Sequence, residues 1–371
     1  MQQIDNNRIR LVIGVTTAAL SLLVLVGWST GIAALTNLLP GAPRTTPLTA
    51  LLLLALAVAV LIATEDRFRP RSASFRIGFG LGLMVVLSSL WTLAKYRFTN
   101  LPKLELLFFR DAVLQNGGNL PGRPSPHSAA SFLLLGLAIL SVNRWGHTCR
   151  VAAVSTSLGA VAIAWVVFFG YASSANPFYA LHDHPGVGMS PITAIGMLLI
   201  AAGIQTLTHT EGLFHLAQAR TAGGTVIRIL LPVALGLPIL LSWTLSSRNT
   251  SQADPSLLGM LGVMALLSMI FAALLIWIGF SLHARELERE QLNRELAASV
   301  AELDRMRSGL IRVCAWTNRV FDDGEWVKFE HYLTKHLNLN ITHGISEEAV
   351  EEQLREIDAM SPEGEQESAV C

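Results

Sequence analysis

Eight long apolar runs fill the first three quarters of the sequence and constrain its fold more than any other feature. A helix needs roughly 20 apolar residues to cross a hydrocarbon core about 30 Å thick, and a helix in lipid satisfies its own backbone hydrogen bonds. The runs cover residues 11–35, 46–64, 76–95, 127–143, 150–172, 191–207, 226–246 and 257–283. The sequence therefore predicts an all-α integral membrane protein with about eight transmembrane helices in a membrane domain over residues 1–283.

The composition agrees with a membrane chain and excludes one class of partner. Hydrophobic residues make up 51% of the chain, charged residues 15%, and the mean hydropathy is +0.47. The 27 basic and 27 acidic side chains cancel, so the positive surplus that nucleic-acid binding needs is missing. We expect contact with membrane lipid and no nucleic-acid partner. The first run lacks a small-residue cleavage site, which predicts a retained helix rather than a signal peptide.

Arginines in the connections predict the orientation of the chain. They gather in the N-terminal tail and in alternate connections, at Arg8, Arg10, Arg67, Arg69, Arg71, Arg76, Arg144, Arg150, Arg220 and Arg228. Basic residues favour the cytoplasmic side of short loops. The connection over residues 95–126 is also basic, but it is longer and joins spans whose other ends agree. We expect a multi-pass protein of a bacterial cytoplasmic (inner) membrane, with both termini in the cytoplasm.

Three of the runs open with nearly the same phrase: LPGAPRTTPLTA from Leu39, LPGRPSPHSAA from Leu120 and HPGVGMSPITA from His184. Each phrase carries a hydroxyl residue that suits a helix N-cap and then a proline that suits the first helical position, where a missing N–H costs nothing. The pairs are Thr46 with Pro47, Ser125 with Pro126, and Ser190 with Pro191. The recurrence favours repeated two-helix units, because a cap alone does not need the upstream Pro-Gly. Convergent capping is the alternative.

The composition becomes polar after the last run, and a helical seam replaces the apolar stretch. Apolar residues recur at steps of about three and four, which is typical of a coiled coil. The seam residues are Leu292, Leu296, Leu303, Met306 and Leu310. Residues 284–313 are therefore predicted to form a helical coiled-coil linker that joins two copies in a homodimer. An amphipathic helix that docks on its own domain is the alternative.

The remaining residues suit only a small domain and a tail. Residues 314–360 contain Trp316, Trp326 and Tyr332, and we expect these aromatic side chains to contact a protein partner. Residues 361–371 are rich in Glu, Ser and Gly, and they are predicted to be disordered.

The motif CAWTNRVFDDGEWVKFEHYL, followed by THGISEEA, resembles the short C-terminal Cys/His module of some bacterial PAS-containing signalling proteins and sensor kinases. The matching residues are Cys314, Arg319, Trp326, Glu330, Tyr332, His343 and Gly344. Thr317, Ser346 and Ala349 stand where the module has its other cysteines. If the complete module binds a metal through thiols, this degenerate copy should not, because one thiolate and a histidine leave a zinc site incomplete.

The membrane part is similar to the multi-pass sensory regions that precede PAS, kinase or cyclase modules in such proteins, where S-P-x-T-A opens a leucine-rich span. The output modules themselves are missing from this sequence: there is no phosphoacceptor box, Walker loop, GGDEF segment, G-x-S-x-G elbow or H-E-x-x-H pair. The lysines lie at or outside span ends, which excludes a retinal Schiff base. We therefore expect no enzymatic activity.

One group of polar residues is a candidate ligand site. His127, His182, Asp183 and His184 lie at span ends on the predicted extracytoplasmic side, with Asp111 nearby in sequence. They would line a small-ligand site; ordinary interfacial loop residues are the alternative. No metal or cofactor is predicted, although the tryptophans leave contact with a pigment, quinone or lipid open.

These patterns favour a non-enzymatic membrane sensor or scaffold that couples a membrane or extracytoplasmic input to a cytoplasmic partner. The second hypothesis is a structural accessory subunit of a larger membrane complex that contains pigments or redox cofactors. A transporter is the weaker third hypothesis, because the span interiors are nearly free of the ionisable residues that transport sites use.

Overall fold

Long apolar helices dominate the chain because each apolar run forms one. The computed structural model describes residues 2–39, 41–63, 73–98, 100–115, 120–142, 147–181, 184–208, 212–248, 255–308, 311–339 and 341–360. Contacts divide the chain into two units, Met1–Arg289 and Glu290–Cys371. The predicted all-α class is confirmed, since strands are few and short.

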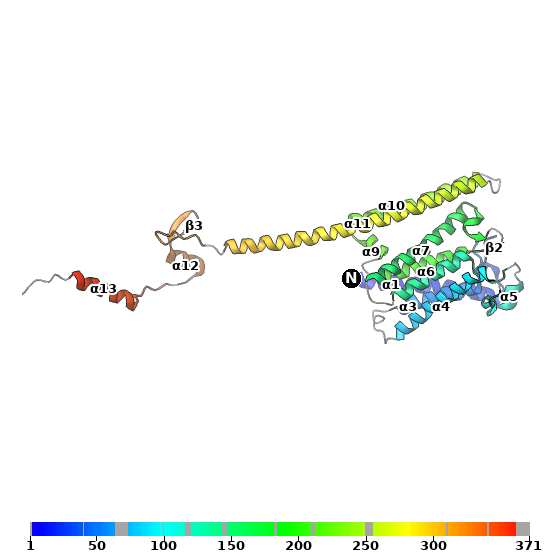
Figure 1. Cartoon of the computed structure of the whole chain (residues 1–371), viewed down its shortest axis with the longest axis horizontal. Coiled ribbons are helices and arrows are strands. Elements are labelled where there is room, and N and C mark those ends of the chain that lie inside the picture. Colours follow the sequence, from blue (N-terminus) through cyan, green and yellow to red (C-terminus); the bar gives the residue numbers. More distant parts are fainter. Residues whose placement is uncertain are drawn as a thin grey trace, which may run out of the picture. The chain divides into compact units, whose positions relative to one another are not determined.

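The first unit is a helical bundle (Figure 1). Its long elements are α1 (Gln2–Thr30), α3 (Pro47–Ile62), α4 (Ala73–Arg97), α6 (Pro126–Val142), α7 (His147–Ala172), α8 (Pro191–Leu207), α10 (Ala222–Arg248) and α11 (Pro255–Ser308). Shorter elements occupy the connections: α2 (Ala33–Thr36), η2 (Leu104–Leu106), α5 (Arg110–Gln115), η3 (Asn176–Phe178), β1 (Ala180–Leu181), β2 (His184–Gly188) and α9 (Leu213–Gln218). Strands β1 and β2 pair antiparallel.

Among the described residues, five helices are long and apolar enough to cross a membrane: α1, α4, α7, α10 and α11. The other three apolar runs form α3, α6 and α8, which have 16, 17 and 17 residues. At 1.5 Å per residue these helices are about 24–26 Å long. The chain is therefore compatible with a multi-pass transmembrane protein, and its short helices are the three whose starts share a sequence phrase.

The short helices form the centre of the first unit. Leu56 on α3, Phe132 and Leu135 on α6, and Ile200 on α8 are all fully buried in one apolar cluster. Small residues allow the helices to approach closely, as membrane bundles require; a Cβ added at Gly136 would lie 2.8 Å from the Val86 side chain. Helices α1, α4 and α7 pack around this centre, each against the short helix that follows it in sequence.

Helices α10 and α11 present apolar side chains to their surroundings. Leu237, Leu266 and Trp277 are 52%, 61% and 67% exposed. Large exposed apolar surfaces are unfavourable in water but suit lipid or a protein partner. Helix α11 continues without interruption for 54 residues, about 81 Å, from this apolar part into a charged segment.

The second unit begins inside α11, within the segment predicted as a helical linker. Beyond α11, the hairpin of β3 (Arg319–Asp322) and β4 (Glu325–Lys328) is followed by α12 (Phe329–Leu337) and α13 (Glu347–Met360). Asp323 and Gly324 have positive φ angles of 47° and 95°, as a two-residue hairpin turn requires. Val320 is the buried centre of the hairpin.

Candidate functional site

The three repeated sequence phrases form three similar helix starts at one end of the first unit. The hydroxyl of each cap residue accepts a hydrogen bond from the backbone N–H three positions later, and each following proline is the first residue of its helix. The caps are Thr46 with Thr49 (3.3 Å), Ser125 with Ser128 (3.2 Å) and Ser190 with Thr193 (3.1 Å). Pro47, Pro126 and Pro191 begin α3, α6 and α8.

An aromatic side chain from the preceding long helix braces each of these starts. Trp28 Nε1 donates to the Thr45 carbonyl at 2.8 Å. The hydroxyl of Tyr96 donates to the Pro124 carbonyl at 2.8 Å, and that of Tyr171 to the Met189 carbonyl at 2.7 Å. Each accepting carbonyl belongs to the residue directly before a cap. We did not predict these donors, although each is a Trp or Tyr in the last turn of its helix.

Two of the helix starts are also joined directly. The Thr45 and Ser190 hydroxyls lie 2.5 Å apart, and both residues are buried. Ser190 thus caps α8 and binds the residue before the cap of α3. This arrangement fixes the α3 and α8 starts relative to each other by polar contacts in a buried environment.

A buried charge cluster holds the connection between α4 and α6. Lys95 Nζ lies 2.5 Å from Glu105 Oε1, and the two side chains are 1% and 6% exposed. Arg123 Nε lies 3.6 Å from the same oxygen, and its guanidinium lies over the Tyr96 ring. Two cations therefore share one carboxylate. This pairing was not predicted, and the only signal for it in the sequence is the number of charges in the connection.

The predicted ligand residues are only partly visible in the described part of the chain. His127 is half-buried in the first turn of α6, and its Nδ1 has no hydrogen-bond partner there. Asp111 is exposed on α5, and His184 begins β2. His182 and Asp183 lie outside the described residues, as does the side chain of His184. Among the described residues, no three His, Cys, Asp or Glu side chains form a group that could hold a metal.

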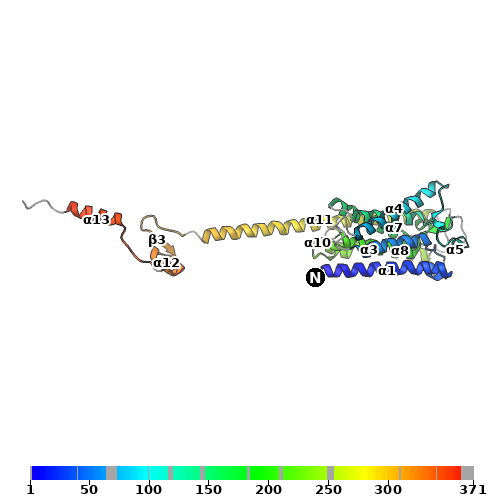
Figure 2. The same cartoon turned by 90° about the horizontal axis from the view of Figure 1, so that it is seen from below.

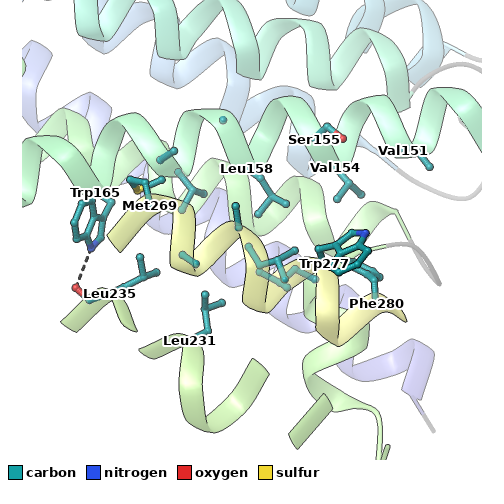
Figure 3. A pocket seen from close by; sticks show the side chains of 17 residues that line it. Val151, Val154, Ser155, Leu158, Trp165, Leu231, Leu235, Met269, Trp277 and Phe280 are labelled. Atoms are coloured by element: carbon teal, nitrogen blue, oxygen red, sulfur yellow. Dashed lines mark hydrogen bonds between the residues drawn. The ribbon is translucent and has the colours of Figure 1, made fainter. Parts of the chain in front are cut away.

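An apolar groove of about 700 Å³ lies between α7, α10 and α11, with Leu213 of α9 also lining it. Figure 3 shows Trp165, Leu235 and Met269 at one end and Val151, Trp277 and Phe280 at the other. Ser155 is the only lining residue with a hydroxyl group. Such a surface can hold an apolar molecule.

One hydrogen bond joins two helices at the end of the groove formed by Trp165, Leu235 and Met269, which we call its inner end. Trp165 Nε1 donates to the Leu235 carbonyl at 3.0 Å and so links α7 to α10. Leu235 lies within the turn before Pro238, where a proline displaces carbonyls from the helical hydrogen-bond pattern. Trp165 also stacks on Phe169, with ring centroids 5.5 Å apart. The indole N–H is therefore engaged by protein and does not point into the groove as a free donor.

Helices α10 and α11 meet in close backbone contact near the other end. A Cβ added at Gly223 would lie 2.2 Å from the Gly279 carbonyl oxygen, so a larger residue does not fit. Beyond this contact, the Thr221 hydroxyl lies 3.1 Å from His283 Nδ1, and the Ala222 N–H donates to Glu286 Oε2. The start of α10 is thereby held to α11 where the apolar part of α11 ends.

The predicted linker seam is an exposed apolar stripe on a charged helix. Leu292, Leu296 and Leu303 are 57%, 64% and 61% exposed in the single chain. The Met306 side chain and Leu310 lie outside the described residues.

The second unit exposes most of its predicted partner residues. Trp316 is 95% exposed and Trp326 44% exposed, whereas Tyr332 is half-buried and packs against His336. A hydrogen bond from the Thr317 side chain lowers the pKa of the Cys314 thiol, and backbone N–H groups of Thr317 and Trp316 add to the effect. The residue at the second thiol position of the resembled module thus contacts the first.

Comparison with known proteins adds no family: no family model, no curated protein and no solved structure matches this chain.

Proposed function

We propose that this protein is a non-enzymatic, multi-pass sensor or scaffold that couples a membrane or extracytoplasmic input to a cytoplasmic protein partner. The observation that carries the proposal is α11. This single helix of 54 residues joins the apolar bundle to a charged segment with an exposed leucine stripe. A continuous helix can transmit sliding or rotation over its length, because its backbone hydrogen bonds leave no joint.

We infer eight membrane crossings, with α3, α6 and α8 as the short ones. Longer helices surround these three, so their polar starts face protein rather than lipid hydrocarbon. The start of α1 and the point where α11 leaves the bundle lie at the same end of the first unit (Figures 1 and 2). That placement supports an even number of crossings.

We further infer that the crossings arose as repeated two-helix units. A long helix, an aromatic donor in its last turn, a capped start and a short helix occur together three times, at α1–α3, α4–α6 and α7–α8. A cap needs no aromatic donor from the helix before it. The joint recurrence supports duplication over convergent capping.

The arginine pattern supports cytoplasmic termini. Arginines gather in the N-terminal tail and in alternate short connections, which favours the N-terminal side as cytoplasmic. The connection over residues 95–126 is basic as well, but it is longer than the other connections.

The stripe on α11 is the proposed contact between two copies. Two helices that bury Leu292, Leu296 and Leu303 against each other would form a short coiled coil. The second unit, with Trp316 and Trp326 exposed, is the proposed contact for the partner. The signal would leave the chain through that protein contact.

The seam can be tested by the oligomeric state of the full chain in mild detergent. We expect Leu296→Lys to convert a dimer into a monomer, because it places a charge in the apolar seam. Ala298→Lys is the matched control on the opposite side of the same helix and should leave the dimer intact. A wild-type monomer would contradict the seam.

The partner contact can be tested by removing residues 311–371. We expect the truncated chain to insert in the membrane and to lose its cytoplasmic partner in cross-linking experiments. Retained capture would contradict the proposal. A stable multi-subunit assembly that survives both Leu296→Lys and the removal of residues 311–371 would instead identify an accessory subunit. Substrate flux in liposomes would identify a transporter.

A further inference from the structure

We propose that the groove between α7, α10 and α11 is a binding site for one acyl chain of a membrane phospholipid. The three walls come from helices that are each long and apolar enough to cross a bilayer. The groove is therefore in contact with lipid wherever these helices span. Its volume of about 700 Å³ is in the range of small-molecule sites.

The length of the groove matches one leaflet. Its lining runs from Val151 to Trp165 on α7 and from Met269 to Phe280 on α11. These stretches are about 21 Å and 17 Å long at 1.5 Å per residue. Half of a hydrocarbon core is about 15 Å. The groove thus extends from near the middle of the helices to the level at which α7 begins.

The chemistry of the lining favours a plain hydrocarbon chain. Ser155 supplies the only hydroxyl, and the indole N–H of Trp165 is already bonded to Leu235. A quinone or pigment ring has polar groups that usually find hydrogen-bond partners, and at the Trp165 end of the groove the one polar lining side chain, Trp165 itself, is already bonded. An acyl chain requires no such partner.

The outer end of the groove suits a phospholipid headgroup. Trp277 is 67% exposed there, and tryptophan favours the membrane–water interface. Arg285 is exposed five residues after Phe280. Its positive charge lies in sequence just beyond the lining residues of α11, where a lipid phosphate would be placed.

The site has a consequence for signalling that rests on the proposed function. The acyl chain would lie between α7 and the α10–α11 pair, and α11 is the helix that leaves the bundle. Occupancy of the groove, or a change in the length of the acyl chain, would then bias the packing of α11 against α7. Lipid composition would be the input.

The binding site can be tested with a phospholipid that carries a photoreactive diazirine in its acyl chain, added to the full-length protein in nanodiscs. We expect more cross-links on residues 151–165 and 269–280, which line the groove, than on residues 83–90 of α4, which serve as the lipid-facing background. An excess of unlabelled phospholipid should lower the cross-linking yield in the groove severalfold and leave the yield on α4 unchanged.

Ala273→Phe should reduce groove labelling severalfold, because it narrows the space between α11 and α7. Leu274→Phe is the matched control, since Leu274 is 49% exposed and does not line the groove. Ala162→Phe narrows the opposite wall and serves if the first variant does not fold. Groove labelling equal to that of α4, or groove labelling unchanged in both Ala273→Phe and Ala162→Phe, would overturn the site. A stoichiometric amount of isoprenoid quinone in a lipid extract of the purified protein would also overturn it.

This readout is independent of the partner. Loss of partner capture with intact groove labelling would reject the sensor and retain the lipid site. Absence of groove labelling with intact partner capture would reject the lipid site and retain the sensor.

Discussion

At the scale of single residues, buried polar side chains determine how the capped end of the bundle is held. Thr46, Ser125 and Ser190 could be identified from sequence because a cap is a local pattern. The Lys95–Glu105–Arg123 cluster could not, because it depends on how the connection folds back onto α4. The same limit applies to Thr45 and Ser190, which are bonded across 145 positions of sequence.

Removing Lys95 should strongly destabilise the bundle. In Lys95→Ala, Glu105 and Arg123 remain but the shortest ion pair is lost, and breaking a buried pair costs about 3–5 kcal/mol in free energy of unfolding. Denaturation in mixed micelles measures the change. Lys103→Ala, an exposed position in the same connection, should stay within about 0.5 kcal/mol of the wild type. Equal stability of the two variants would show that the cluster is not stabilising.

The thiol of Cys314 should react readily with alkylating reagents at neutral pH. Its pKa is lowered chiefly by the hydrogen bond from Thr317, so a larger fraction is thiolate at a given pH. Thr317→Val removes the hydroxyl and should move the pH midpoint of the alkylation rate upward. Mass spectrometry of the labelled peptide follows the rate. An unchanged midpoint would mean that Thr317 does not act on the thiol.

At the scale of elements, the sequence determined the helices better than their contacts. All eight apolar runs form helices, since apolar length is read directly from residues. Their unequal lengths follow from Pro47, Pro126 and Pro191, each of which fixes where a short helix begins. The aromatic braces and the Gly223–Gly279 contact were missed, because both join segments whose distance in space the sequence does not give.

Loss of one aromatic brace should weaken its helix start. Tyr171→Phe keeps the ring but leaves the Met189 carbonyl without its donor, which costs about 1–3 kcal/mol when the group is buried. Tyr179→Phe is the matched control, because its hydroxyl bonds Asn176 at an exposed site. Hydrogen exchange of the first turn of α8 should increase in the first variant only. Equal exchange in both would reject the brace.

The junction between the β3–β4 hairpin and α12 should loosen in acid. Hydrogen bonds from Lys335, and then from His336, lower the pKa of the Asp322 carboxyl below its usual 3.8. A carboxyl with a lowered folded-state pKa stabilises the fold above its unfolded pKa, and this stability is lost as the pH falls through the folded value. Hydrogen exchange of the hairpin should therefore rise below about pH 4. In Asp322→Asn the acid dependence should be smaller; an unchanged dependence would contradict this assignment.

At the scale of the whole molecule, composition and apolar length predict a helical membrane chain, and the structure supports that level of description. The groove could not be predicted, because its lining brings together apolar residues from helices that are far apart in the sequence. The spacing of the linker leucines is read within one helix, and their contact with a second copy stays a prediction.

An even number of crossings should place both ends of the chain on one side. In a chain with Cys149 and Cys314 replaced by serine, a cysteine introduced by Gln2→Cys and the native Cys371 should react alike with an impermeant maleimide in sealed vesicles. A cysteine from Asn176→Cys, near the capped helix starts, should show the opposite accessibility. Opposite behaviour of the two ends would reject eight crossings.

The leucine stripe of α11 exists only at one spacing of its residues. Each residue of an α-helix turns the chain by about 100°, so one residue added between Leu296 and Leu303 would turn Leu303 about a quarter of a turn away from the other leucines, whereas seven would nearly restore its direction. An insertion of one residue would therefore divide the stripe without removing a single leucine.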